Sequence, residues 1–179
     1  MGHNIPTFFF PVNTTVLKDI DVTEDFVQHY LGEKFESRHE EGIREVTSRN
    51  WWYQDTVLEL VKRLNISGLE FLSDELIILD KTRLSKANAS LDQLISKISD
   101  SIPVFSDQEH EEHIGIIKLS REDVLFAFQK ANPDFVINPP VDSGFEAVVG
   151  FYSFLKSMHA AINNALERDL LLVYYRSQP

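Results

Sequence analysis

The chain has 179 residues, of which 43% are hydrophobic and 25% charged, a composition typical of a globular domain rather than a disordered segment. It contains no cysteine, which excludes disulfides, cysteine-ligated zinc, iron–sulfur clusters and thiol catalysis. The formal net charge of −11 opposes binding to phosphate backbones and anionic lipids, so we expect neither nucleic acid nor a membrane as a partner.

The first predicted element is a strand at residues 7–12, TFFFPV, because its aromatic side chains favour β structure. Pro6 and Pro11 bound this run, and because proline cannot donate a hydrogen bond in a sheet, we expect an edge strand. The same prolines interrupt the apolar run, and no basic segment precedes it, so neither a signal peptide nor a membrane span is indicated. We therefore expect a cytoplasmic protein that forms a single domain over residues 1–179.

Two helices are predicted next. Thr23 can cap the first, and apolar or aromatic residues that include Phe35 recur at mostly helical spacing, which predicts one helix to about Val46. The second helix is predicted to begin at Ser48 or Asn50 and to end near residue 65, with an apolar stripe facing the core.

The later part of the chain alternates between strand and helix. In order, we expect a strand at 75–79, a helix from Ser90 capped with Gln93, a strand at 114–120, a helix at 120–133, a helix at 144–167 and a strand at 170–177. The helix at 144–167 is apolar over much of its circumference, which indicates the central packing element. Its direct passage into the last strand places that strand near the middle of the sheet. The whole pattern predicts an α+β fold, with a mixed sheet of about four to five strands packed by five helices.

The stretch SDQEHEEHIGI (106–116) is the densest acidic segment. No basic residue lies between Lys97 and Lys118, while the segment carries the carboxylates of Asp107, Glu109, Glu111 and Glu112. It is either a solvated loop or a patch whose negative field attracts a cationic partner. The segments KDIDVTED (18–25) and RHEEGIRE (38–45) would enlarge such a patch if they fold nearby.

The histidines of this stretch do not match a zinc-protease motif. His110 and His113 are three positions apart, whereas H-E-x-x-H places its histidines four apart. A metal would need a further ligand, for which His39 is a candidate. Because the chain also lacks nucleophile and phosphate-binding motifs, we assign no catalytic residue, no metal ligand and no cofactor.

The segment NWWYQD (50–55) offers aromatic anchors for a partner. Three adjacent aromatic residues on a helix fan out over about 200°, so they cannot all point into one core stripe. Trp51 or Trp52 would then lie at the surface, where tryptophan is a favoured interface residue. The alternative is that these side chains cover the edge of the core at the start of the helix.

In size, charge and absence of cysteine the chain resembles bacterial immunity and antitoxin proteins. This likeness rests on composition, and no motif carries it. It implies an acidic binding protein, rather than an enzyme, that occludes a basic toxin or enzyme. The residues that we expect at this interface are Asp107, Glu109, Glu111, Glu112, Trp51 and Trp52.

Two alternatives stay open at this point. One is a metal-assisted hydrolase of unknown substrate that uses His39, His110 and His113. The other is a self-associating structural subunit, such as a homodimer, built on the apolar helix near 145–166.

Overall fold

The computed structural model describes residues 4–15, 17, 21–38, 40–49, 52–100, 121–133 and 145–177. Its strands are β1 (Asn4–Val12), β2 (Arg44–Arg49), β3 (Leu76–Leu79) and β4 (Leu171–Arg176). Its α-helices are α1 (Glu24–Glu33), α2 (Trp52–Arg63), α3 (Lys81–Asp100), α5 (Arg121–Lys130) and α6 (Phe145–Glu167), and a short 3-10 helix, η1, spans Glu70–Ser73. The predicted α+β class is therefore confirmed. The described strands all pair antiparallel, in the order β2-β1-β4-β3, so this sheet is not mixed in direction.

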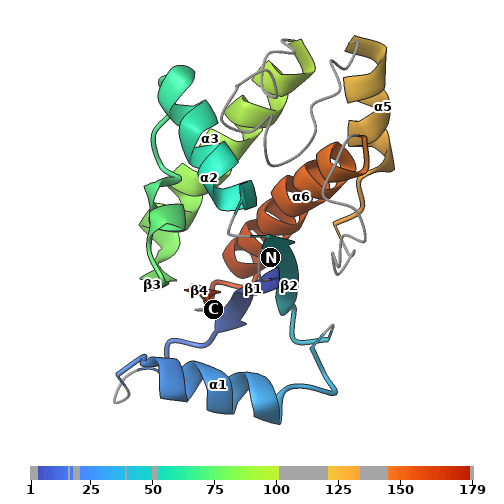
Figure 1. The fold of residues 1–179 in the computed structure, drawn as a ribbon. Helices are drawn as coiled ribbons and strands as arrows, with labels where there is room; N and C mark the ends of the chain where they lie inside the picture. Colours follow the sequence, from blue (N-terminus) through green and yellow to red (C-terminus); the bar gives the residue numbers. More distant parts are fainter. Residues whose placement is uncertain are drawn as a thin grey trace.

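Helices cover both faces of the sheet (Figure 1). Helix α1 lies on one face, and α2, α3 and α6 lie on the other, with α5 packed against α6. Successive residues of a strand point to opposite faces, so Phe9 and Tyr174 enter the larger core while Phe10 and Val173 enter the core under α1. Because both faces are buried, β1 and β4 are apolar along most of their length instead of alternating with polar residues.

Strand β1 lies inside the sheet, between β2 and β4, so the expectation of an edge strand is wrong. Asn4–Phe9 pair with β2 and Thr7–Val12 pair with β4, so only residues 7–9 have a paired neighbour on both sides. Pro6 and Pro11 each fall where β1 pairs with one strand alone, and a residue without an N–H is tolerated there. Strand β4 lies between β1 and β3, which confirms its predicted place in the middle of the sheet.

The segment after Thr23 forms a helix and then a strand, not the single helix to Val46 that the spacing predicts. Thr23 does cap α1, but α1 ends at Glu33. A turn that contains Gly42, with φ +77°, leads into β2. Ile43 and Val46 are buried on opposite faces of the sheet, as expected for positions three apart in extended backbone.

Helix α3 begins at Lys81, well before Ser90. Asp80 is the residue that caps it, because its carboxylate accepts a hydrogen bond from the Arg83 N–H at 2.9 Å. Ser90 lies inside the helix, and its hydroxyl donates to the Lys86 carbonyl one turn earlier at 2.8 Å. The prediction that Ser90 caps the start of the helix is therefore wrong, and its hydroxyl instead faces the carbonyl oxygens of Lys86 and Ser67.

The bounds of α2, β3, α5 and α6 agree with the predicted elements to within a few residues. Helix α6 packs against α3, α5 and the strands β1, β2 and β4. Its role as the central element remains an interpretation. The strand expected at 114–120 lies outside the described residues.

Gly68 is predicted to be essential for the turn between α2 and η1. Its φ is +121°, and a Cβ here would lie 2.6 Å from Ser90 Oγ and 3.0 Å from Lys86 Cγ. We expect Gly68→Ala to lower the free energy of unfolding by about 1–3 kcal/mol, because the backbone and the contact are both unfavourable. The matched control is Gly32→Ala in α1, where a Cβ meets nothing within 4 Å. Urea unfolding followed by circular dichroism should show Gly32→Ala unchanged or more stable by up to about 1 kcal/mol, and equal losses in both variants would contradict the prediction.

The buried tyrosines predict a loss of stability in alkali. Burial raises the pKa of Tyr152 and Tyr174 above the usual value of about 10. Above that pH the unfolded chain loses these protons and the folded chain keeps them, so the free energy of unfolding falls as pH rises. Above the pKa of the unfolded chain, one such tyrosine lowers the free energy of unfolding by up to about 1.4 kcal/mol per pH unit.

Tyr152→Phe tests this directly, because Tyr152 forms no hydrogen bond with the residues that the structure describes. Urea unfolding measured between about pH 9 and pH 11 should show a shallower decline for the variant than for the original chain. Identical slopes would mean that Tyr152 already ionises in the folded protein.

Candidate functional site

Most residues that the sequence nominates for a site lie outside the described part of the chain. This holds for Asp107, Glu109, Glu111, Glu112, His39, His110, His113 and Trp51. Trp52 is the first residue of α2, but its side chain is likewise outside the description. The acidic interface and the histidine site expected at these positions therefore stay predictions.

The third aromatic residue of NWWYQD, Tyr53, belongs to the core. It is buried, and its ring centroid lies 5.6 Å from that of Phe154 and 6.3 Å from that of Phe151. The neighbouring Gln54, which the sequence did not single out, donates to the Thr7 hydroxyl at 2.5 Å. Both partners are buried, so this hydrogen bond ties the start of α2 to β1.

Helix α1 is held on the sheet by its inner side. Val27 and Leu31 are buried in the core between α1 and the sheet. The Tyr175 hydroxyl donates to the Glu24 carboxylate at 2.6 Å and accepts from the Gln28 amide at 3.2 Å. This anchoring leaves the outer side of the helix and the turn that follows it in contact with solvent.

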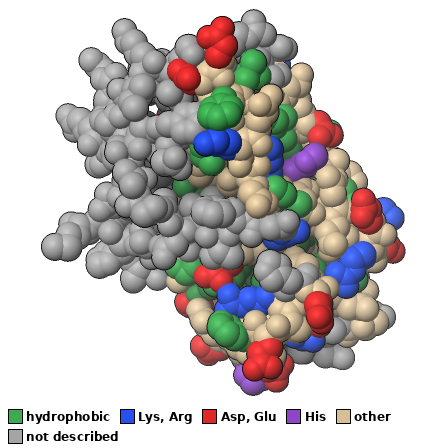
Figure 2. All heavy atoms as spheres, turned by 90° about the vertical axis from the view of Figure 1, so that its right-hand side faces the viewer, with side chains coloured by type: hydrophobic (Ala, Val, Ile, Leu, Met, Phe, Trp, Pro, Cys, Tyr) green, Lys and Arg blue, Asp and Glu red, His purple; other side chains and the backbone are tan. Residues whose placement is uncertain are grey.

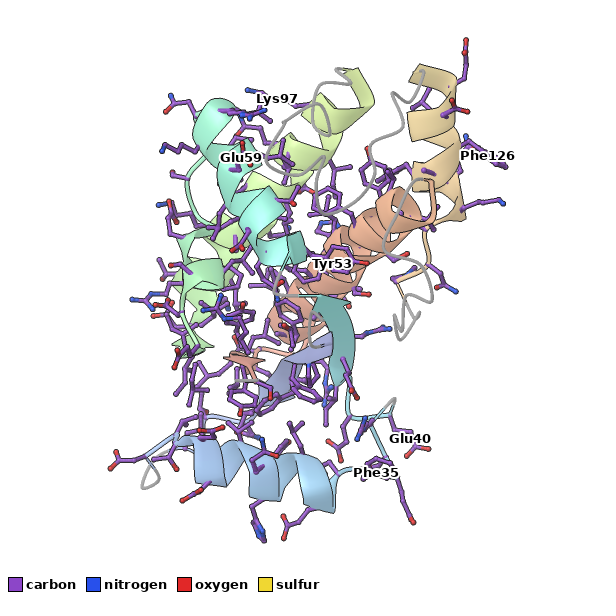
Figure 3. The ribbon with its side chains drawn as sticks, viewed as in Figure 1. Phe35, Glu40, Tyr53, Glu59, Lys97 and Phe126 are labelled. Carbon is purple, nitrogen blue, oxygen red and sulfur yellow. The ribbon has the colours of Figure 1, made fainter. Side chains whose placement is uncertain are left out.

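Several exposed carboxylates and one exposed aromatic ring lie along that outer side, from the residues just before α1 to the turn after it. We name this set the α1 surface: Asp21, Asp25, Glu33, Phe35, Glu36 and Glu40. Phe35 is 64% exposed, although it is one of the residues whose spacing predicts a single helix to about Val46. Figure 3 shows Phe35 and Glu40 on the same turn, at the outside of the molecule. In Figure 2 this end of the molecule, the lower end, carries several acidic side chains with basic ones among them.

The basic side chains of this region are engaged with neighbours. Segment 21–45 contains eight acidic and three basic residues, a net charge of −5. Lys34 pairs with Glu41 at 3.0 Å, and this hydrogen bond raises the pKa of Lys34. Arg38 forms an ion pair with Glu45 of β2, and Arg44 donates to the backbone carbonyl of Pro133, after α5, at 3.3 Å. These contacts stabilise the turn and leave it acidic.

Four carboxylates of the α1 surface are not neutralised by a basic side chain among the described residues. Asp21, Asp25, Glu36 and Glu40 form no ion pair with any residue that the structure describes. Exposed charges of one sign add to a field that reaches over a Debye length of about 8 Å at physiological salt. Chemically, the arrangement can attract a cationic group and accept hydrogen bonds from arginine or lysine.

Helix α6 uses its apolar side chains within the chain. The fully buried ones include Phe151, Phe154, Leu155, Met158 and Ile162. The described side chains of α6 therefore leave no broad apolar face for a second copy, which weighs against self-association through this helix.

The described ranges contain neither a candidate metal-binding cluster nor a candidate membrane-spanning helix. No group of three or more histidine, aspartate or glutamate side chains is placed there to hold a metal ion. None of the helices in those ranges is long and apolar enough to cross a membrane.

Comparison with known proteins found no significant match to a family model, a curated protein or a solved structure. The inferences about the α1 surface therefore rest on its exposed residues and their charges.

If Phe35 belongs to the surface, its removal will hardly affect folding. We expect Phe35→Ala to lower the free energy of unfolding by at most about 1 kcal/mol, the value of an exposed contact with Arg38. Leu31→Ala, on the inner side of the same region, should cost about 2–5 kcal/mol. Urea unfolding of the two variants measures both. A loss at Phe35 as large as that at Leu31 would place its ring in the core.

Proposed function

We propose that this protein binds a basic protein partner through the α1 surface and occludes it, in the manner of an immunity or antitoxin protein that covers a cationic toxin or enzyme. The observation that carries the proposal is the exposure of Asp21 and Asp25 near the start of α1 and of Glu36 and Glu40 in the same turn as Phe35, without ion pairs to described residues. The net charge of −11, nearly half of it in segment 21–45, supports the same partner class.

In this mechanism the charged residues affect the rate of association, and the apolar contact affects the stability of the complex. The carboxylates attract the partner at long range and raise the association rate, then pair with arginine or lysine at contact. Phe35 supplies the apolar anchor that becomes desolvated in the complex, and aromatic anchors of this kind carry much of the affinity of protein interfaces. Because α1 is fixed to the sheet, the surface is formed before binding and little ordering is needed.

The acidic stretch at 106–116 extends this proposal. Asp107, Glu109, Glu111 and Glu112 would add to the negative field, and Trp51 or Trp52 would provide a second aromatic anchor. Three of these residues, Glu109, Glu111 and Glu112, are tested separately from the α1 surface, so either group can fail without the other.

The experiment compares single Glu→Lys substitutions, each of which changes the charge by the same amount, on the α1 surface and at a distant exposed position. Glu36→Lys and Glu40→Lys change the α1 surface, while Glu122→Lys changes an exposed carboxylate at the start of α5 and serves as the matched control. The original chain and the variants are used as baits in cell extract, and a retained basic protein is purified for stopped-flow measurements. We expect the α1-surface variants to associate about tenfold more slowly, with a smaller change in dissociation, and added salt to reduce the difference.

Equal association rates for Glu40→Lys and Glu122→Lys would remove the α1 surface from the interface. The same measurement on Glu109→Lys, Glu111→Lys and Glu112→Lys decides whether the acidic stretch contributes. Phe35→Ala should mainly raise the dissociation rate, because it removes a contact made only in the complex.

A further inference from the structure

Strand β3 has one edge that no described strand occupies. It pairs with β4 on one side, and the sheet order β2-β1-β4-β3 ends with it. Figure 1 shows β3 at the outer edge of the sheet, away from β1 and β2. The side chains of Leu76, Ile77 and Ile78 are only half-buried there. An apolar edge of this kind can accept a further strand.

The register identifies which backbone groups face outward. The Arg176 N–H donates to the Glu75 carbonyl at 2.7 Å, so this pair is a hydrogen-bonded one. Pairs alternate along an antiparallel ladder, which makes Ile77 hydrogen-bonded to β4 and leaves the N–H and C=O groups of Leu76 and Ile78 pointing away from it. The edge therefore presents two donors and two acceptors at the spacing of an added strand.

The charges around this edge indicate what could bind. Asp74, Glu75 and Asp80 flank β3, are exposed, and form no ion pair with the described residues. The nearest basic residue in sequence, Lys81, pairs with Asp169 at 3.0 Å. A segment that carries lysine or arginine on both sides of a short extended apolar run would match both the backbone groups and the acidic flanks.

A second copy of the chain fits this edge poorly. In a symmetrical antiparallel pairing of two β3 strands centred on Ile77, the outward-facing Leu76 of one copy lies opposite Ile78 of the other, and Asp74 would then lie opposite Asp80. Like charges directly opposite each other destabilise a strand pair, and acidic flanks are a common means of preventing edge-to-edge association. The same flanks favour a basic segment from a different protein.

We propose that the β3 edge is a second binding site, which takes up an extended, lysine- or arginine-flanked segment of a partner protein as an added strand. The site is independent of the α1 surface, because it uses the backbone of Leu76 and Ile78 rather than exposed side chains of α1. Affinity comes from main-chain hydrogen bonds, and the acidic flanks select the sign of charge.

The probe is the synthetic peptide Lys-Lys-Val-Thr-Val-Thr-Val-Lys-Lys, with a glutamate-flanked version of the same core as its control. Amide hydrogen exchange is followed by nuclear magnetic resonance on the full chain. With the lysine-flanked peptide in excess, exchange at Leu76 and Ile78 should slow by about tenfold or more, while the glutamate-flanked peptide should bind at least about tenfold more weakly.

Ile78→Pro removes the outward N–H and part of the half-buried side chain, and it leaves the hydrogen bonds to β4 intact, because Ile78 does not donate to β4. It should weaken peptide binding by about tenfold, and Ile78→Val, which keeps the N–H, should bind as the original chain does. Glu75→Lys is a second variant that spares the β3 backbone, and it should reduce the preference for the lysine-flanked peptide, because the summed charge of the three flanking residues falls from −3 to −1. Glu36→Lys with Glu40→Lys should leave peptide binding unchanged, which separates this site from the proposed function.

Unchanged exchange at Leu76 and Ile78 in the presence of the lysine-flanked peptide would overturn the proposal. So would equal affinity of folded Ile78→Pro, or an unchanged preference of Glu75→Lys for the lysine-flanked peptide. Protection that rises with protein concentration in the absence of peptide would assign the edge to a second copy and would also overturn it.

Discussion

The burial of both faces of the central strand pair, β1 and β4, is the constraint on which the rest of the structure depends. On one face Phe9 packs against Tyr174, with ring centroids 5.4 Å apart, and on the other Phe10 packs against Tyr30 at 5.3 Å. Buried aromatic rings are among the largest contributions to a core, and here consecutive residues supply two cores at once. The protein must therefore place helices on both sides of one sheet.

Because of this constraint, the two sides of α1 have different roles. The inner side closes the smaller core through Val27 and Leu31, and folding requires it. The outer side makes few contacts with the rest of the described chain, so its residues can be acidic at little cost to stability. An amphipathic helix that covers one face of a sheet is thus also a rigid base for a charged surface, which is how the fold and the proposed interface are connected.

Much of the fold could be predicted from sequence, because periodicity reports burial. The helices α2, α5 and α6 and the strands β3 and β4 follow directly from their patterns. The errors arise where one local pattern is compatible with two structures. Apolar residues three apart, such as Ile43 and Val46, fit a helix face and also the two faces of a strand, and only pairing with β1 decides between them.

The candidate site was harder to find than the fold. The acidic stretch at 106–116 attracts attention because its charges are contiguous, whereas the carboxylates of the α1 surface are distributed over a helix and a turn. The segments 18–25 and 38–45 gave a partial signal. Nothing in the local pattern showed that Phe35 is exposed, since its spacing agrees with a buried stripe and its actual position depends on where α1 ends.

The pairing of β1 with β4 also affects the order in which the molecule can form. Thr7 lies opposite Arg176, so neighbouring central strands come from nearly opposite ends of the sequence. During synthesis the aromatic residues of β1 leave the ribosome long before the strand that shields them. Contacts between such distant residues slow folding, and an apolar strand that waits for its neighbour is exposed to aggregation. The order β2-β1-β4-β3 is completed only when residues 171–176 have emerged, so β1 must stay unpaired on its β4 side for most of synthesis.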